Sequence, residues 1–134
     1  MSVTILIADD HAVVRDGLKM ILESADGMRV VAMAADGREA VSLAEEHRPD
    51  VIIMDISMPG LNGIEAARMI CEQLPGVRIL ILSMHQSVEH IYRAKAAGAS
   101  GYLLKESAGS EVVTAVRTVM KGRNFYGRGI EQPL

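Results

Sequence analysis

The chain has 134 residues, a length that suits one domain built around a single hydrophobic core. Hydrophobic residues make up 49% of it, and its one cysteine, Cys71, excludes an intrachain disulfide bridge. A net charge of −3 and an aromatic content of 3% argue against a surface for binding nucleic acid. There is no signal segment and no apolar run near the roughly 20 residues of a membrane helix, so we expect a soluble cytoplasmic protein.

Five short apolar runs alternate with stretches of helical periodicity along the chain. The first, third and fourth runs consist almost entirely of β-branched residues and leucine, as in parallel strands that are buried on both faces. The fifth is shorter and more mixed, which predicts an edge strand. The runs cover residues 3–8, 29–34, 51–54, 77–82 and 101–104.

Turn and cap residues support helices between these strands and after the last one. Ser87 and Ser107 are expected to be N-caps, and Gly122 stands where the last helix should end. Five βα units joined by right-handed crossovers predict an α/β protein with a flavodoxin-like (βα)5 fold. Its doubly wound parallel sheet would have the strand order 2-1-3-4-5. Residues 123–134 are expected to form a tail or the start of a linker.

Polar side chains follow four of the five predicted strands at their carboxyl ends. Asp9 and Asp10 follow the first strand, Asp55 the third, Ser83 the fourth and Lys105 the fifth. Parallel strands all end at the same rim of a sheet, and ligands of such folds bind at this rim. We therefore expect these five side chains to converge.

Three carboxylates this close repel one another unless a cation lies between them. Mg²⁺ fits best because it prefers oxygen ligands, and the four histidines are too scattered for a His/Cys site. Our hypothesis is that Asp10 and Asp55 bind Mg²⁺ directly, that Asp9 acts through water, and that Asp55 is a nucleophile forming an aspartyl phosphate. Lys105 and Ser83 would then meet phosphate oxygens.

Each of these residues also has a structural interpretation when taken singly. An Asp-Asp pair before a helix commonly caps it, a lysine after a strand is commonly solvated, and a serine there is commonly an N-cap. Their appearance together on one rim is what favours phosphoryl chemistry.

The same residues resemble the receiver domain of two-component response regulators, and most closely its NarL/FixJ, or LuxR-type, branch. The motifs are Asp9-Asp10-His11, Met54-Asp55-Ile56-Ser57-Met58-Pro59-Gly60 with Asn62-Gly63, and Gly101-Tyr102-Leu103-Leu104-Lys105-Glu106. The match runs from about residue 3 to 122, so residues 1–122 would form the receiver domain. The resemblance implies that Asp55 accepts a phosphoryl group from a sensor histidine kinase. It also implies that Asp10, Asp55 and the backbone carbonyl of Ser57 bind Mg²⁺.

The resemblance further implies a switch formed by Ser83, Tyr102 and Lys105. A phosphate on Asp55 adds charge and acceptor oxygens, so Ser83 gains by moving toward it and Tyr102 can rotate into the space that Ser83 leaves. The responding face would comprise the fourth helix, the fifth strand and the fifth helix. The alternative for Tyr102 is an edge tyrosine that only covers apolar surface.

Two departures from the family pattern concern the loop after the last strand and the output. Glu106 follows Lys105 where many receivers have a proline. The helix-turn-helix module of the branch is absent, so we expect either an excised receiver of a transcription factor or a stand-alone receiver acting by protein contact. DNA would be bound only through the absent module, and part of the fifth helix could serve a homodimer. Ser57 and His85 are candidate modulators of phosphate lifetime.

Two other functions remain open at this point. One is a Mg²⁺-dependent phosphohydrolase with an aspartate nucleophile, although Ser57 stands where haloacid-dehalogenase-like phosphatases usually carry a second aspartate. The other is a flavodoxin-like domain that binds flavin or a nucleotide, although no glycine-rich phosphate loop follows the first strand.

Overall fold

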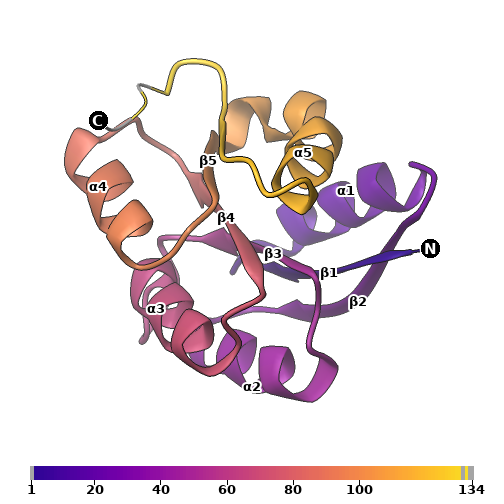
Figure 1. Ribbon diagram of the computed structural model, residues 1–134, viewed down its shortest axis with the longest axis horizontal. Coiled ribbons are helices and arrows are strands. Elements are labelled where there is room, and N and C mark those ends of the chain that lie inside the picture. Colours follow the sequence, from indigo (N-terminus) through magenta and orange to yellow (C-terminus); the bar gives the residue numbers. More distant parts are fainter. Residues whose placement is uncertain (1, 131, 133–134) are drawn as a thin grey trace.

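The parallel β-sheet lies between two layers of helices in the computed structural model, which describes residues 2–130 and 132 (Figure 1). Within this part of the chain the strands are β1 (Val3–Ala8), β2 (Met28–Ala34), β3 (Val51–Asp55), β4 (Arg78–Ser83), β5 (Gly101–Leu104) and β6 (Phe125–Tyr126). The helices are α1 (Ala12–Glu23), α2 (Gly37–His47), α3 (Gly63–Gln73), α4 (Val88–Ala96) and α5 (Lys105–Met120). The strand order 2-1-3-4-5-6 confirms the predicted order of the first five strands and leaves β2 at one edge.

Each central strand sends alternate side chains to opposite faces of the sheet. In β1, Ile5 and Ile7 pack with the residues of α1 and α5, whereas Leu6 and Ala8 pack with those of α2, α3 and α4. The strands β3 and β4 divide their side chains in the same way. Because helices cover both faces, the central strands are apolar at almost every position, and this is why they appear in the sequence as continuous apolar runs.

Side-chain caps fix the starts of the two helices that flank the carboxyl rim of the sheet. Asn62 accepts hydrogen bonds from the backbone N–H groups of Ile64 and Glu65 in the first turn of α3, at 2.9 and 3.0 Å. Ser87 accepts one from the N–H of His90 at 3.3 Å, which confirms its predicted role as the N-cap of α4.

The prediction that Ser107 caps the last helix is wrong. The helix α5 begins two residues earlier, at Lys105, and Leu104 occupies the cap position without a side-chain hydrogen bond. The backbone passes from the extended conformation of Leu104 into the helix with no intervening loop. Lys105 is therefore held at the rim of the sheet by both β5 and α5.

A glycine at the start of α3 lets this helix begin directly against the end of β3. A Cβ atom on Gly63 would overlap the backbone carbonyl oxygen of Asp55. The N–H of Gly63 also donates to the carbonyl of Ile56 at 2.9 Å. The close approach fixes the position of the Asp55 backbone.

The prediction that β5 is an edge strand is wrong within the described residues. Part of the expected tail forms β6, which pairs in parallel with β5 (yellow in Figure 1). The N–H of Phe125 donates to the carbonyl of Ser100, and that of Gly127 donates to the carbonyl of Tyr102, both at 3.0 Å. A strand of two residues is too short to produce a periodic pattern, so the sequence did not reveal it.

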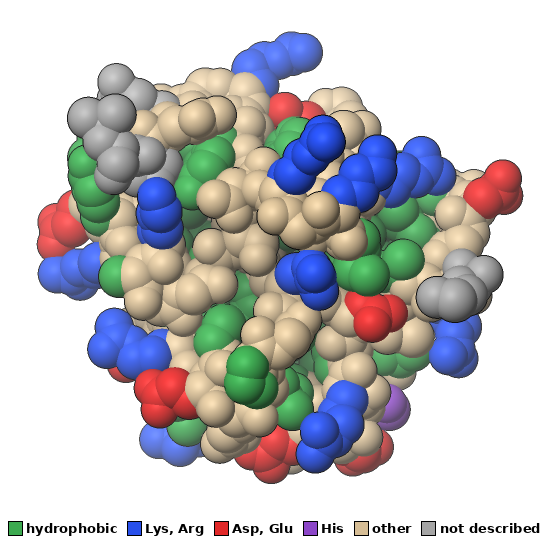
Figure 2. Space-filling view, in the orientation of Figure 1, with side chains coloured by type: hydrophobic (Ala, Val, Ile, Leu, Met, Phe, Trp, Pro, Cys, Tyr) green, Lys and Arg blue, Asp and Glu red, His purple; other side chains and the backbone are tan. Residues whose placement is uncertain are grey.

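Charged side chains of both signs are interspersed over the face seen in Figure 2, with small apolar areas between them. Among the helices of the described residues, none is long and apolar enough to cross a membrane.

Candidate metal and phosphoacceptor site

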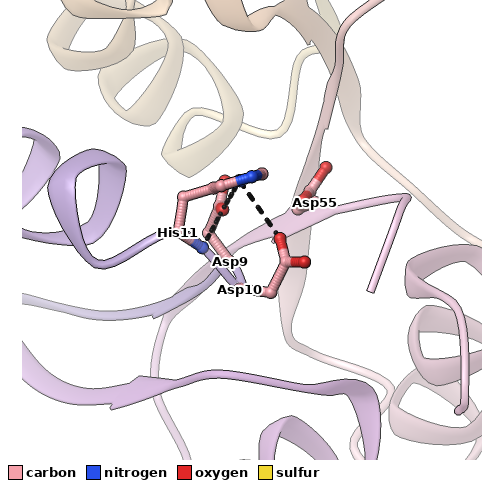
Figure 3. A group of neighbouring side chains, drawn as sticks. All are labelled: Asp9, Asp10, His11 and Asp55. Atoms are coloured by element: carbon pink, nitrogen blue, oxygen red, sulfur yellow. Dashed lines mark hydrogen bonds and ion pairs between the residues drawn. The ribbon is translucent and has the colours of Figure 1, made fainter. Parts of the chain in front are cut away.

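The carboxyl rim of the sheet gathers acidic side chains that are far apart in the sequence. Asp9 and Asp10 follow β1, and Asp55 is the last residue of β3. One ligand atom from each of these residues and from His11 lies within 4.8 Å of the others (Figure 3). Asp9 and Asp55 are buried, whereas Asp10 and His11 are exposed. The expected convergence of the three aspartates is therefore present in the structure.

Lys105 links the two buried carboxylates of this cluster. Its Nζ atom lies 2.9 Å from Oδ2 of Asp9 and 3.0 Å from Oδ2 of Asp55. The side chain of Lys105 is only 9% exposed, and those of the two aspartates are 0% and 1% exposed. One ammonium group is thus shared by two carboxylates in a largely dry environment, where each ionised group depends on its partners.

The surroundings of Asp55 disfavour its ionised form. Burial raises the pKa of the Asp55 carboxyl, and the negative charge of Asp9 adds to this effect. The hydrogen bond and positive charge of Lys105 oppose it, as does the N–H of Ser57, which donates to Oδ1 of Asp55 at 3.3 Å, but the pKa remains raised. A further cation at the site would therefore stabilise the carboxylate.

Lys105 remains an ammonium ion in spite of its burial. Desolvation by burial lowers its pKa, but the hydrogen bonds and charges of Asp9 and Asp55 outweigh this effect and raise the pKa overall.

Sequence reasoning did not assign His11 to this site. Nδ1 of His11 lies 3.1 Å from Oδ1 of Asp9 and 3.2 Å from Oδ1 of Asp10 (Figure 3). It also lies 3.4 Å from Nζ of Lys105. Its backbone N–H also donates to Oδ1 of Asp9 at 2.8 Å. The available signal was its position directly after the aspartate pair.

Arg15 is a second residue that the sequence did not reveal. Nη1 of Arg15, from the first turn of α1, donates to the backbone carbonyl of Asp9 at 2.7 Å. This carbonyl belongs to the peptide group that joins Asp9 to Asp10, so the contact fixes the backbone between the two carboxylates. The spacing of four residues from His11 places both on one side of the helix start.

The expected switch residues lie in neighbouring strands: Ser83 is the last residue of β4, and Tyr102 is the second residue of β5. The buried Ser83 hydroxyl donates to the backbone carbonyl of His85 at 2.8 Å and accepts from the N–H of His85 at 3.2 Å. Tyr102 is 1% exposed, and its hydroxyl has no hydrogen-bond partner among the described residues. Burial raises the pKa of Tyr102, and the nearby Ser83 hydroxyl opposes this effect. The two hydroxyl groups are therefore neighbours without being bonded to each other.

The donor set at the rim suits Mg²⁺. Carboxylate oxygens are the ligands that Mg²⁺ prefers, and this cluster contains three carboxylates. Within the described residues, Oδ2 of Asp9 is buried without a hydrogen bond and has only its ion pair with Lys105. Ser57, whose N–H reaches Asp55, brings its backbone to the same place. Asp10, Asp55 and the Ser57 carbonyl would hold the ion, with Asp9 beside it.

A doubly wound parallel α/β domain with an acidic cluster and a lysine at its carboxyl rim defines a class of protein suited to phosphoryl chemistry. The family model of the response regulator receiver domain matches residues 5–117. The chain therefore belongs to the response regulator receiver domain family, which confirms the resemblance that its motifs indicated.

Curated relatives and solved structures agree with this assignment. The chain is 49% identical over 122 residues to the oxygen regulatory protein NreC of Staphylococcus haemolyticus, covering 90% of the chain and 56% of NreC. It is 37% identical over 128 residues to the transcriptional regulatory protein MctR of Rhizobium johnstonii, covering 96% of the chain and 60% of MctR.

Among solved structures, a crystal structure of a LuxR-family two-component response regulator from an Aurantimonas species has a TM-score of 0.90 and 40% identity. The alignment covers 96% of this chain and 91% of that one. The chain spans between half and two thirds of the length of the curated relatives that it matches.

Proposed function

We propose that this domain is a phosphorylation-activated signalling switch in which Asp55 accepts a phosphoryl group from the phosphohistidine of a sensor histidine kinase in the cytoplasm. The observation that carries the proposal is the environment of Asp55. Its carboxylate lies within 4.8 Å of the ligand atoms of Asp9 and Asp10 and 3.0 Å from the ammonium group of Lys105. Membership of the receiver family supports the same function.

The two oxygens of Asp55 have different surroundings, and this suits them to different tasks. Oδ2 is bound to Lys105, whereas Oδ1 has, among the described residues, only the long hydrogen bond from the N–H of Ser57. Oδ1 attacks the phosphorus atom, the bond between phosphorus and the kinase imidazole breaks, and the imidazole leaves with the bonding electrons. Bound Mg²⁺ would neutralise phosphate oxygens during this transfer. Lys105 then pairs with one phosphate oxygen as a point charge.

The phosphate alters the contacts of Ser83 and thereby those of Tyr102. In the structure the Ser83 hydroxyl is bonded to the backbone of His85. Phosphate oxygens are stronger acceptors than a carbonyl, so Ser83 turns toward them and vacates space next to the Tyr102 hydroxyl. Tyr102 moves further into this space, and the face formed by α4, β5 and α5 changes with it. Ser57 and His85 modulate the lifetime of the phosphate: the N–H of Ser57 reaches the Asp55 carboxylate, and the backbone of His85 is bonded to Ser83.

The proposed output of the switch is transcriptional control. We propose that residues 1–122 act as the receiver and that 123–134 lead toward a C-terminal helix-turn-helix that binds DNA. The names of NreC and MctR, which describe regulatory proteins, and their greater length support transcriptional control. Phosphorylation would favour homodimers through part of α5. A stand-alone receiver that acts by protein contact is the alternative.

Intact mass spectrometry tests the phosphoacceptor assignment. Incubation with acetyl phosphate and Mg²⁺ should add one phosphate to the wild-type chain, and Asp55→Asn should abolish the addition. Asp50→Asn, which changes the same residue type at the other end of β3, is the matched control and should still take up phosphate. Labelling that persists in Asp55→Asn would contradict the assignment, and rapid turnover of a panel of phosphate esters would favour a phosphohydrolase instead.

A further inference from the structure

The segment of residues 124–130, called here the β6 segment, is attached to the sheet at several points. The backbone N–H of Gly127 donates to the carbonyl of Tyr102 at 3.0 Å, next to the pairing of β6 with β5. Further along, the N–H of Arg128 donates to Oε2 of Glu111 in α5 at 2.9 Å. Ile130 packs against the core that Tyr102 belongs to. The segment is therefore held by both β5 and α5 (Figure 1).

Tyr126 of this segment lies directly beside Tyr102. The two residues are register partners in the parallel pair of β5 and β6, so their side chains stand on the same face of the sheet. Both rings border a small gap lined by α4 residues, including Ile91 and Ala94, and this gap leaves no room for a water molecule. Tyr126 thus fills the side of Tyr102 that faces the edge of the sheet.

Hydrogen bonding does not explain why the Tyr102 ring is buried. Its hydroxyl has no partner among the described residues, and the neighbouring Ser83 hydroxyl is bonded to His85. A buried hydroxyl without a partner favours an outward rotation of the ring toward water. Tyr126 stands on the edge side of Tyr102, so a rotation of the ring toward that side would require Tyr126 to move. Attachment of the β6 segment therefore opposes a rotation of Tyr102 toward the edge of the sheet.

We propose that the β6 segment is a working part of the switch: it holds Tyr102 in its buried orientation and is itself held more firmly when Asp55 carries a phosphate. The inference rests on the proposed function, because the link to Asp55 runs through Ser83. A phosphate that favours the buried orientation of Tyr102 disfavours its rotation toward the edge of the sheet and thereby favours the attached state of the β6 segment. The position of the chain beyond β5 thereby depends on the state of Asp55.

Because coupling between two sites is reciprocal, it can be measured at the β6 segment and at Asp55. If a phosphate group at Asp55 stabilises the attached state of the β6 segment, then loss of the attachment must weaken the binding of a phosphate mimic by the same factor. Beryllofluoride with Mg²⁺ is a suitable mimic because it binds reversibly, so that both sides can be measured at equilibrium.

The first measurement is amide hydrogen exchange at Phe125 and Gly127, followed by NMR with and without beryllofluoride and Mg²⁺. Exchange of both amides should be slowed about fivefold or more by the mimic, the lower end of typical coupling between sites. The amide of Ile5, in the sheet centre, serves as a reference. Equal exchange of Phe125 and Gly127 in a sample saturated with the mimic overturns the proposal.

The second measurement is the affinity for beryllofluoride in variants of the segment, determined by calorimetric titration in the presence of Mg²⁺. Tyr126→Ala should weaken binding about fivefold or more. Glu111→Ala, which removes the acceptor for the Arg128 N–H, should weaken it less and serves if Tyr126→Ala fails to fold. The control is Met20→Ala, because Met20 is an exposed side chain on α1, outside the face formed by α4, β5 and α5, and its affinity should equal that of the wild type.

The outcomes separate this proposal from the one on which it rests. Folded Tyr126→Ala and Glu111→Ala proteins that bind the mimic as tightly as the wild type overturn the role of the β6 segment while leaving Asp55 as the phosphoacceptor. A wild-type chain that neither binds the mimic nor gains a phosphate by intact mass overturns the proposed function, and the coupling falls with it.

Discussion

Asp50 directly precedes the strand β3 and Asp55 is its last residue, and the two carboxylates have opposite surroundings. At the amino end, Oδ2 of Asp50 accepts hydrogen bonds from the N–H and the hydroxyl of Thr4, at 2.9 and 3.2 Å. At the carboxyl end, Asp55 shares the ammonium group of Lys105 with Asp9. Asp50, whose hydrogen bonds come from neutral donors, stabilises the fold. Asp55, which lies among like charges, is available for binding and chemistry.

The difference between the two ends is one of charge balance. Asp9, Asp10 and Asp55 bring three negative charges to the carboxyl rim, and Lys105 offsets only one of them. Such an arrangement costs stability unless a further cation is bound, which is why the rim suits Mg²⁺ and then the oxygens of a phosphate. Four variants test the contrast, from the largest expected effect to the smallest.

Removal of the shared ammonium group should have the largest effect on stability. We expect Lys105→Met to lower the free energy of unfolding by about 3 kcal/mol at neutral pH without Mg²⁺, because two buried carboxylates lose their partner. The loss should shrink as the pH falls. Lys105 lowers the pKa of Asp55 in the folded state, so without the ammonium group this pKa lies further above its unfolded value and protonation of Asp55 favours the folded state. Urea denaturation at a series of pH values measures this.

Mg²⁺ distinguishes this explanation from a simple packing defect. Lys105→Met should retain Mg²⁺ binding, since the ion can take over the charge of the ammonium group, while the response to phosphate is impaired. Saturating Mg²⁺ should then recover part of the lost stability. Lys95→Met, at an exposed position on α4, is the control and should change neither the stability nor the Mg²⁺ affinity. A loss of Mg²⁺ affinity as large as the loss of stability would contradict the separate roles of lysine and metal.

The second variant displaces the Asp55 backbone instead of its charge partner. A methyl group in Gly63→Ala would overlap the Asp55 carbonyl oxygen, so α3 and the end of β3 must move apart, at a cost of about 2 kcal/mol. Mg²⁺ affinity, measured by calorimetric titration, should fall with the stability. Gly17→Ala is a control of opposite sign: a methyl group there, within α1, meets open space, so the helix should become more stable by about 0.5–1 kcal/mol.

The amino end of β3 provides the third variant. Thr4→Val keeps the side-chain shape but removes the hydroxyl that donates to Asp50, which should cost about 1 kcal/mol. Phosphate uptake, followed by intact mass, should be unchanged because the site lies at the other end of the strand. Slower or incomplete uptake in Thr4→Val would contradict the division of tasks between the two ends.

The sequence allowed the central fold and the convergence at the rim to be predicted for a common reason. Parallel strands covered on both faces require continuous apolar runs, and their shared direction brings Asp9, Asp55 and Lys105 to one edge. The parts that the sequence did not predict depend on short elements or on the orientation of single side chains. A strand of two residues carries no periodicity, and the start of α5 at Lys105 reflects its immediate junction with β5. The contacts of His11 and Arg15 depend on side-chain orientations that no spacing reveals.

The smallest expected effect on stability concerns Asp55 itself. Because its pKa is raised in the folded state, ionisation of Asp55 costs folding free energy, and Asp55→Asn should raise the urea midpoint slightly at neutral pH in the absence of Mg²⁺. Below the ordinary pKa of aspartate the carboxyl is protonated in the folded and the unfolded state, so the difference in midpoint between the wild type and Asp55→Asn should vanish there. This difference grows as the pH rises toward the raised pKa and reaches its full size above it. Asp50→Asn should instead lower the midpoint, because an amide oxygen is a weaker acceptor for the two Thr4 donors than a carboxylate. If both variants shifted the midpoint in the same direction at neutral pH, the two ends of β3 would not differ in the way that their contacts indicate.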